Sequence, residues 1–123
     1  MDNKFYVSLE AARLLKEKGY RERYHAYYFG DSNLRKGGYR GDSWYDSPDF
    51  YPAPTKSEVI DWLESKGLVI VVFRRTINNE VGWRYVIYNQ TEIISGFKTR
   101  LEAEEAAIIK ALELLKIRTN DFS

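Results

Sequence analysis

The clearest pattern of hydrophobic and polar positions begins at Thr55 and predicts a helix. Thr55 and Glu58 have the spacing of a capping box, in which the hydroxyl accepts from the Glu58 amide and the carboxylate accepts from the Thr55 amide. Pro54 disfavours helix at the residue before it, and Gly67 suits the left-handed residue that ends a helix. Between these signals, apolar residues recur at helical spacing: Val59, Ile60, Trp62 and Leu63.

Two further helices are predicted, one on each side of this segment. Ser8 is a suitable N-cap for the first, and Gly19 suits its end. Thr99, with Glu102 three residues later, begins the last, which we expect to run to about Ile117. Their apolar faces contain Leu9, Ala12 and Leu15 in the first helix and Leu101, Ile108, Leu112 and Leu115 in the last.

Three strands are predicted between the second and third helices. Residues 68–73 form an unbroken apolar run, which is typical of a strand covered on both faces, so we expect it at the centre of the sheet. Asn78 and Asn79 suit a tight hairpin turn, and the return strand is expected at about residues 81–88. The third strand is expected at residues 92–97.

The segment from Tyr20 to Tyr51 is rich in aromatic residues and glycine and has no sustained period. Aromatic residues favour pleated surfaces, so residues 24–29 predict a strand. Residues from about 30 to 51 are expected to form a long irregular loop. Such loops are usually functional or disordered, and the many aromatic residues argue against disorder.

These patterns predict one α+β domain over residues 1–123 with the element order α-β-loop-α-β-β-β-α. We expect an antiparallel sheet of three or four strands with two or three helices packed on one face. The 123 residues suit one domain with a core of its own, and 44% of them are apolar.

Composition excludes several classes of chemistry. The net charge of +1 gives no field that would favour nucleic acid or an anionic membrane. There is no cysteine, which excludes disulfides and thiolate chemistry. No apolar run approaches the roughly 20 residues that span a bilayer. Because the first residues also lack the apolar core of a signal peptide, we expect a cytoplasmic protein.

The residues that could carry catalysis form no recognisable constellation. His25 is the only histidine, and no nucleophile motif accompanies it. Asp42, Asp46 and Asp49 lie close together in the loop and could hold a divalent cation, but aspartate is also a common turn residue. A metal-dependent enzyme that uses these aspartates is therefore an alternative to the main hypothesis, which has no catalytic residue, metal or cofactor.

The candidate binding residues are Tyr39, Arg40, Trp44 and Tyr45, because Tyr, Trp and Arg are enriched where proteins bind one another. The partner would be another protein, or a second copy of this chain. Nucleic acid is an alternative partner, disfavoured because the acidic and basic residues of this segment cancel. The α-β-β-β-α order is that of the double-stranded RNA-binding domain, but three glutamates follow Lys98 and Arg100 where phosphate would bind: Glu102, Glu104 and Glu105.

Residues 5–116 resemble a family of small uncharacterised proteins associated with phage-like and mobile elements of Bacteroides-type genomes. The resemblance lies in Tyr6-Val7-Ser8, Leu15-Lys16-Glu17-Lys18-Gly19-Tyr20, Ala53-Pro54-Thr55, Trp62-Leu63 and a last helix rich in Glu-Ala pairs. It implies a phage or mobile-element origin and no established activity or catalytic residue. We therefore expect a non-enzymatic interaction protein.

Overall fold

The computed structural model describes residues 3–22, 24–37, 47–88, 90 and 92–115. Its helices are the short 3-10 helix η1 (Asn3–Phe5), α1 (Leu9–Glu17), α3 (Lys56–Ser65) and α4 (Arg100–Leu114). Its strands are β1 (Ala26–Phe29), β2 (Arg35–Lys36), β3 (Phe50–Pro52), β4 (Ile70–Ile77), β5 (Glu80–Ile87) and β6 (Ile94–Phe97). The predicted α+β class is confirmed.

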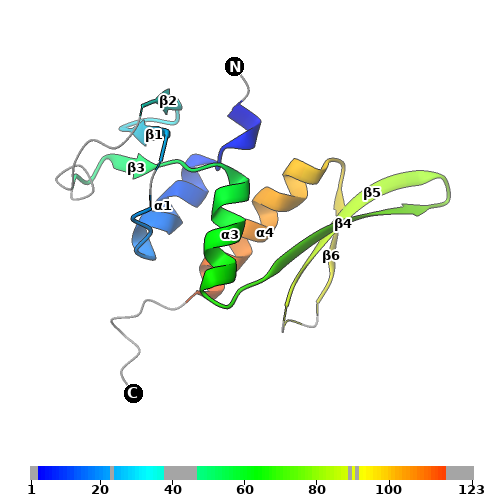
Figure 1. Cartoon of the computed structure of the whole chain (residues 1–123). Coiled ribbons are helices and arrows are strands. Elements are labelled where there is room, and N and C mark those ends of the chain that lie inside the picture. Colours follow the sequence, from blue (N-terminus) through cyan, green and yellow to red (C-terminus); the bar gives the residue numbers. More distant parts are fainter. Residues whose placement is uncertain (1–2, 23, 38–46, 89, 91, 116–123) are drawn as a thin grey trace.

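The strands form two antiparallel sheets rather than one. The first has the order β2-β1-β3 and the second β4-β5-β6. The strand expected at residues 24–29 is β1. It pairs with β2, which lies within the segment at residues 30–51 that was predicted to be irregular, and with β3, which begins in that segment. Residues 38–46 of that segment lie outside the described residues. Figure 1 shows the two sheets on opposite sides of the helices.

The helices begin where the sequence predicts, because each start is set by a side chain next to it. The Ser8 hydroxyl accepts from the Ala11 amide at 3.2 Å. At α3 both bonds of the capping box form, from the Glu58 amide to Thr55 at 3.2 Å and from the Thr55 amide to Glu58 at 2.9 Å. At α4 the Glu102 amide donates to the Thr99 hydroxyl at 3.2 Å, but the Glu102 carboxylate accepts from the Lys98 amide, at 3.0 Å, rather than from the Thr99 amide. The described helix ends at Leu114, before the predicted end.

The core forms around α4, which contacts α1, α3 and all three strands of the second sheet. Its buried face contains Ala107, Ile108, Ala111 and Leu112. Together with residues from the other elements, these make one main cluster that includes Val7, Leu15, Tyr28, Leu63, Ile70, Tyr85 and Ile87. Tyr24, which precedes β1, and Phe50 of β3 form a smaller buried cluster beside the first sheet.

The prediction that residues 68–73 form a central strand was wrong. Their strand, β4, lies at the edge of its sheet, and β5 is central. Ile70 faces the core, but the next residue, Val71, is 46% exposed on the other face. A run of β-branched residues suits any pleated strand, so it does not require cover on both faces.

Candidate interaction surface

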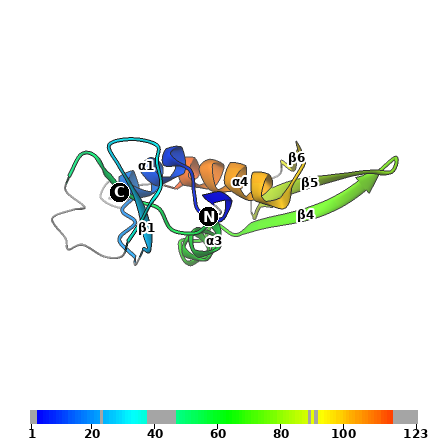
Figure 2. The same ribbon diagram turned by 90° about the horizontal axis from the view of Figure 1, so that it is seen from above.

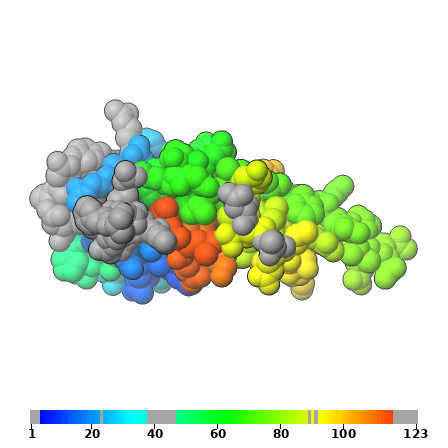
Figure 3. Space-filling view, turned by 90° about the horizontal axis from the view of Figure 1, so that it is seen from below, coloured from blue at the N-terminus to red at the C-terminus, as the bar shows by residue number. Residues whose placement is uncertain are grey.

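The most prominent surface feature is the β4–β5 arm, which we define as residues 70–87. This hairpin extends away from the three helices (Figures 1 and 2). In the space-filling view it forms a narrow projection from a thicker body (Figure 3). Asn78 and Asn79 make the turn with φ of 53° and 64°, the left-handed values that a tight hairpin needs.

The base of the arm is covered, whereas its tip is not. The third strand, β6, pairs with β5 only at positions 83–85 of the arm. Ile70, Tyr85 and Ile87 are buried at the base. Beyond them, Ile77 is 47% exposed and Val81 54% exposed, so the outer half of the hairpin carries apolar side chains into solvent.

The register of the arm places its side chains on two faces. On the face that is buried at the base, the cross-strand pairs are Ile70–Ile87, Val72–Tyr85, Arg74–Trp83 and Thr76–Val81. On the opposite face they are Val71–Val86, Phe73–Arg84, Arg75–Gly82 and Ile77–Glu80. Neighbouring residues of a strand point to opposite faces, so Arg74 and Arg75 put one guanidinium on each. Both faces therefore combine apolar groups with positive charge.

The arm is positively charged, because it contains three arginines and one glutamate: Arg74, Arg75, Arg84 and Glu80. Among the described residues, the ion pairs are Arg35–Asp31, Lys56–Glu105 and Arg100–Glu104, so no carboxylate there pairs with these arginines. Because arginine is enriched at protein interfaces, the arm is the candidate interaction surface of the described residues.

A second feature is the buried Lys56, which links α3 to the N-terminal segment and to α4. Its Nζ donates to the Lys4 carbonyl and lies 3.9 Å from Glu105 Oε1. Glu105 in turn accepts from the Ser8 amide at 3.3 Å and from the Ser8 hydroxyl at 2.5 Å. Burial lowers the pKa of Lys56, and the charges of Glu105 and Glu104 partly oppose that shift. We assign this network a structural role, because its bonds join α3 and α4 to the segment that precedes α1.

A groove of about 730 Å³ runs past Lys56 along α4. Its apolar lining is Phe97, Leu101, Ala106 and Ile109, and its polar lining is Lys4, Lys56, Thr99, Glu102 and Glu105. The volume would suit a small molecule. The two lysines and the two glutamates balance, however, so the lining selects neither an anion nor a cation.

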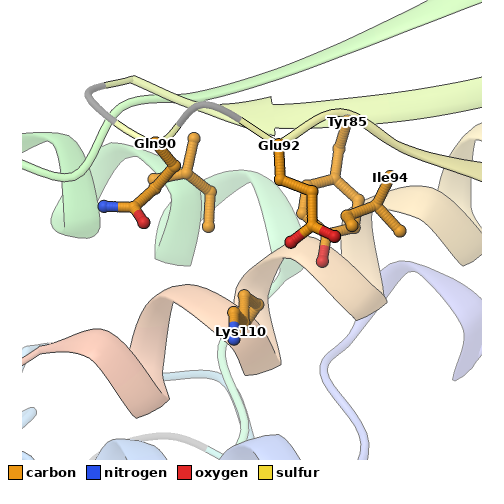
Figure 4. Close-up of a pocket in the computed structure, with 6 residues that line it drawn as sticks. Tyr85, Gln90, Glu92, Ile94 and Lys110 are labelled. Carbon is orange, nitrogen blue, oxygen red and sulfur yellow. The ribbon is translucent and has the colours of Figure 1, made fainter.

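A smaller cavity of about 130 Å³ lies between the second sheet and α4 (Figure 4). Tyr85 and Glu92 point from the sheet side toward the helix that carries Lys110 (Figure 4). Burial raises the pKa of Tyr85, and the charges of Glu92 and Glu113 add to the rise. Substrate pockets usually measure roughly 300–1,000 Å³, so this cavity is too small for one.

The residues expected to bind a partner, Tyr39, Arg40, Trp44 and Tyr45, lie outside the described residues, as do Asp42 and Asp46. Asp49 is exposed, and no cluster of three or more metal-ligating side chains occurs within the described ranges. His25 is exposed. Tyr24, Tyr28 and Phe50 are buried, so these aromatic residues pack the fold.

Sequence reasoning missed the arm as a candidate site. Its one available signal was the adjacent pair Arg74 and Arg75 inside a β-branched run. Within the described part of the chain, no helix is long and apolar enough to cross a membrane. Comparisons with protein-family models, with curated proteins and with solved structures found no match.

Proposed function

We propose that this chain is a non-enzymatic interaction protein that binds a partner protein through the β4–β5 arm. The observation that carries the proposal is the projection of an apolar, arginine-bearing hairpin beyond the cover of the helices. A phage or mobile-element origin, and action in the cytoplasm, belong to the same proposal. The origin is supported by the resemblance of residues 5–116, and the compartment by the absence of cysteine.

The physical argument rests on what binding would bury. Val71, Ile77 and Val81 are each about half exposed. Removing apolar surface from water contributes about 25 cal/mol per Å². Scattered exposed apolar residues are ordinary, but these three belong to one hairpin and lie beside arginines that have no described carboxylate partner. A partner that covered the arm would bury these apolar side chains and could also place carboxylates against the arginines.

The test is a pull-down from host lysate with the full chain and two arm variants, Ile77→Ser and Arg75→Glu. Both side chains are exposed, so we expect the variants to fold. We expect each to recover about fivefold less of the partner, which corresponds to roughly 1 kcal/mol. Lys110→Glu, an exposed site on α4, is the charge-matched control and should recover as much as the parent chain.

Equal recovery by all of these variants would show that the arm is not the binding surface. The loop residues then become the leading candidates. Trp44→Ala combined with Tyr45→Ala belongs in the same experiment, because Tyr39, Arg40, Trp44 and Tyr45 remain a proposed contact surface in their own right.

Nucleic acid is the second candidate partner. It is favoured by the three unpaired arginines of the described arm, since the major groove of DNA admits a two-stranded β-ribbon. It is disfavoured by exposed carboxylates on α3: Glu58, Asp61 and Glu64. A gel shift at low salt separates the candidates, because phosphate contacts are strongest there. A shift that Arg74→Glu abolishes would favour nucleic acid.

A further inference from the structure

We propose that the outer edge of β4 binds an extended acidic segment of the partner as an additional antiparallel strand. The inference rests on the proposed function and specifies its chemistry. It concerns backbone hydrogen bonds at one edge of the arm, whereas the proposed function requires only that the arm be buried.

The hydrogen-bond pattern shows which groups of β4 are available. The Tyr88 amide donates to the Val69 carbonyl at 2.8 Å, which fixes the phase of the antiparallel ladder. Bonded and non-bonded pairs alternate, so the odd-numbered residues of β4 bond to β5. The amides and carbonyls of Val72, Arg74 and Thr76 therefore point away from β5. In the described structure no strand pairs with them.

This edge lacks most of the features that prevent strands from pairing. Exposed edge strands are usually short, bulged or interrupted by proline or lysine. Here β4 has 8 residues with neither proline nor lysine. Its pairing with β5 runs without a break from Ile70–Ile87 to Ile77–Glu80. Only the two arginines modify the edge, and they select among partners rather than exclude all of them.

The arginines indicate the charge of the added strand. Arg74 and Arg75 are consecutive, so one points to each face of the sheet. A partner strand with two consecutive carboxylates would place one opposite each guanidinium, and opposite charges across a strand pair stabilise it. The flanking Val71, Phe73 and Ile77 favour β-branched residues around the acidic pair. The partner segment is thus an acidic pair between β-branched residues.

A second copy of this chain fits the edge less well. Two β4 strands paired antiparallel would bring together two arms that each carry three arginines and one glutamate. Neither β4 strand contains a carboxylate to offset them. Like charges across a strand pair are destabilising, so an acidic segment is favoured.

The probe is the acetylated, amidated octapeptide Val-Thr-Glu-Glu-Val-Thr-Val-Thr, titrated into the isotope-labelled full chain and followed by NMR. We expect saturable shifts of the amides of Val72, Arg74 and Thr76. Replacing both glutamates of the peptide by lysine should weaken binding by about tenfold or more. No saturable shift at the edge of β4, or equal binding of the lysine peptide, would overturn the proposal.

N-methylation of the peptide separates backbone pairing from side-chain contact. Methyl groups on the two peptide residues opposite Val72 and Arg74 remove hydrogen bonds to β4, and we expect about tenfold weaker binding. Methyl groups on the residues opposite Phe73 and Arg75 point away from β4 and should have little effect. Equal effects at both pairs of positions would contradict strand addition.

The variant Thr76→Pro makes the same test in the lysate pull-down. Proline removes an outward amide and is tolerated on that side of an edge strand, and Thr76→Ala is the control that keeps the amide. If Ile77→Ser reduces recovery but Thr76→Pro does not, strand addition is wrong and the proposed function stands. If neither reduces recovery, both are wrong. Sedimentation of the chain alone as a dimer that Thr76→Pro dissociates would assign the edge to a second copy.

Discussion

At the scale of single residues, Tyr28 is the side chain whose polar group is best placed to affect stability. It is buried in β1, and its hydroxyl donates to the Val7 carbonyl at 2.8 Å. The bond joins the first sheet to the segment that enters α1. Burial raises the pKa of Tyr28, and the negative charge of Glu105 adds to the rise.

We expect Tyr28→Phe to lower the free energy of unfolding by about 1 kcal/mol at neutral pH, because a buried hydrogen bond is lost. A folded-state pKa above the unfolded value of 10.0 means that the neutral phenol's contribution is complete below pH 10.0 and is lost as pH rises through the folded pKa. The variant should therefore lose less stability than the parent chain above pH 10.0.

Urea unfolding at neutral and alkaline pH measures this difference. The variant should still lose some of its free energy of unfolding at alkaline pH, since burial also raises the pKa of Tyr85. Tyr88→Phe is the control: Tyr88 is 64% exposed, and the change should leave the free energy of unfolding at neutral pH unchanged. Identical pH profiles for Tyr28→Phe and the parent chain would contradict the assignment.

At the scale of elements, the helix starts are the features on which sequence and structure agree best. Thr55 closes both bonds of the capping box at α3, and α3 contacts α4 and β4. We expect Thr55→Ala to lower the free energy of unfolding by about 1 kcal/mol, because the Glu58 amide in the first turn loses its acceptor. Chemical denaturation measures the effect. Ser57→Ala, in the same turn but exposed and outside the cap, should have a much smaller effect.

The same comparison shows why the sheets were harder to predict. A helix cap depends on residues only three apart in the sequence, so it can be predicted locally. In contrast, β3 pairs with β1 across more than twenty residues of chain, and no local pattern indicates that pairing. The run at residues 68–73 correctly indicated a strand and wrongly indicated its place, because β-branched residues do not show whether a second face is covered. The hairpin turn was predicted, since Asn78 and Asn79 carry that information locally.

The sequence did not predict the arm as the candidate site. Sequence reasoning expected Tyr, Trp and Arg to bind a partner and placed them at Tyr39, Arg40, Trp44 and Tyr45, which stays a prediction. It did not select Arg74, Arg75 or Ile77, because their exposure depends on how far the hairpin extends past β6 and the helices. That length is a property of the assembled molecule.

At the scale of the whole molecule, the outer arm should be separable from the body. Arg75 and Gly82 face each other in β4 and β5 at a bonded pair, so a two-residue turn can join them. We expect a chain in which residues 76–81 are replaced by Asn-Gly to keep its melting temperature within a few degrees. All six residues removed are exposed.

The shortened chain should at the same time recover little of the partner in the lysate pull-down, because it lacks Ile77, Val81 and Thr76, the last of which is one of the three outward residues of the open edge. Circular dichroism and thermal melting measure the first expectation, and the pull-down the second. A large fall in melting temperature would show that the arm is part of the fold. Undiminished recovery would place the partner elsewhere on the surface.

The central position of α4 has a consequence for how the chain folds as it is synthesised. Helices α1 and α3 and the second sheet pack against α4, yet α4 is the last of the described elements to leave the ribosome. Until then, the apolar faces of α1 and α3 and the base of the hairpin lack the cover that α4 supplies, and exposed apolar surface of this kind makes incomplete chains prone to aggregation. A ribosome stalled before Arg100 would therefore hold a protease-sensitive chain with exposed apolar surface, and emergence of α4 would supply the surface on which the described core closes.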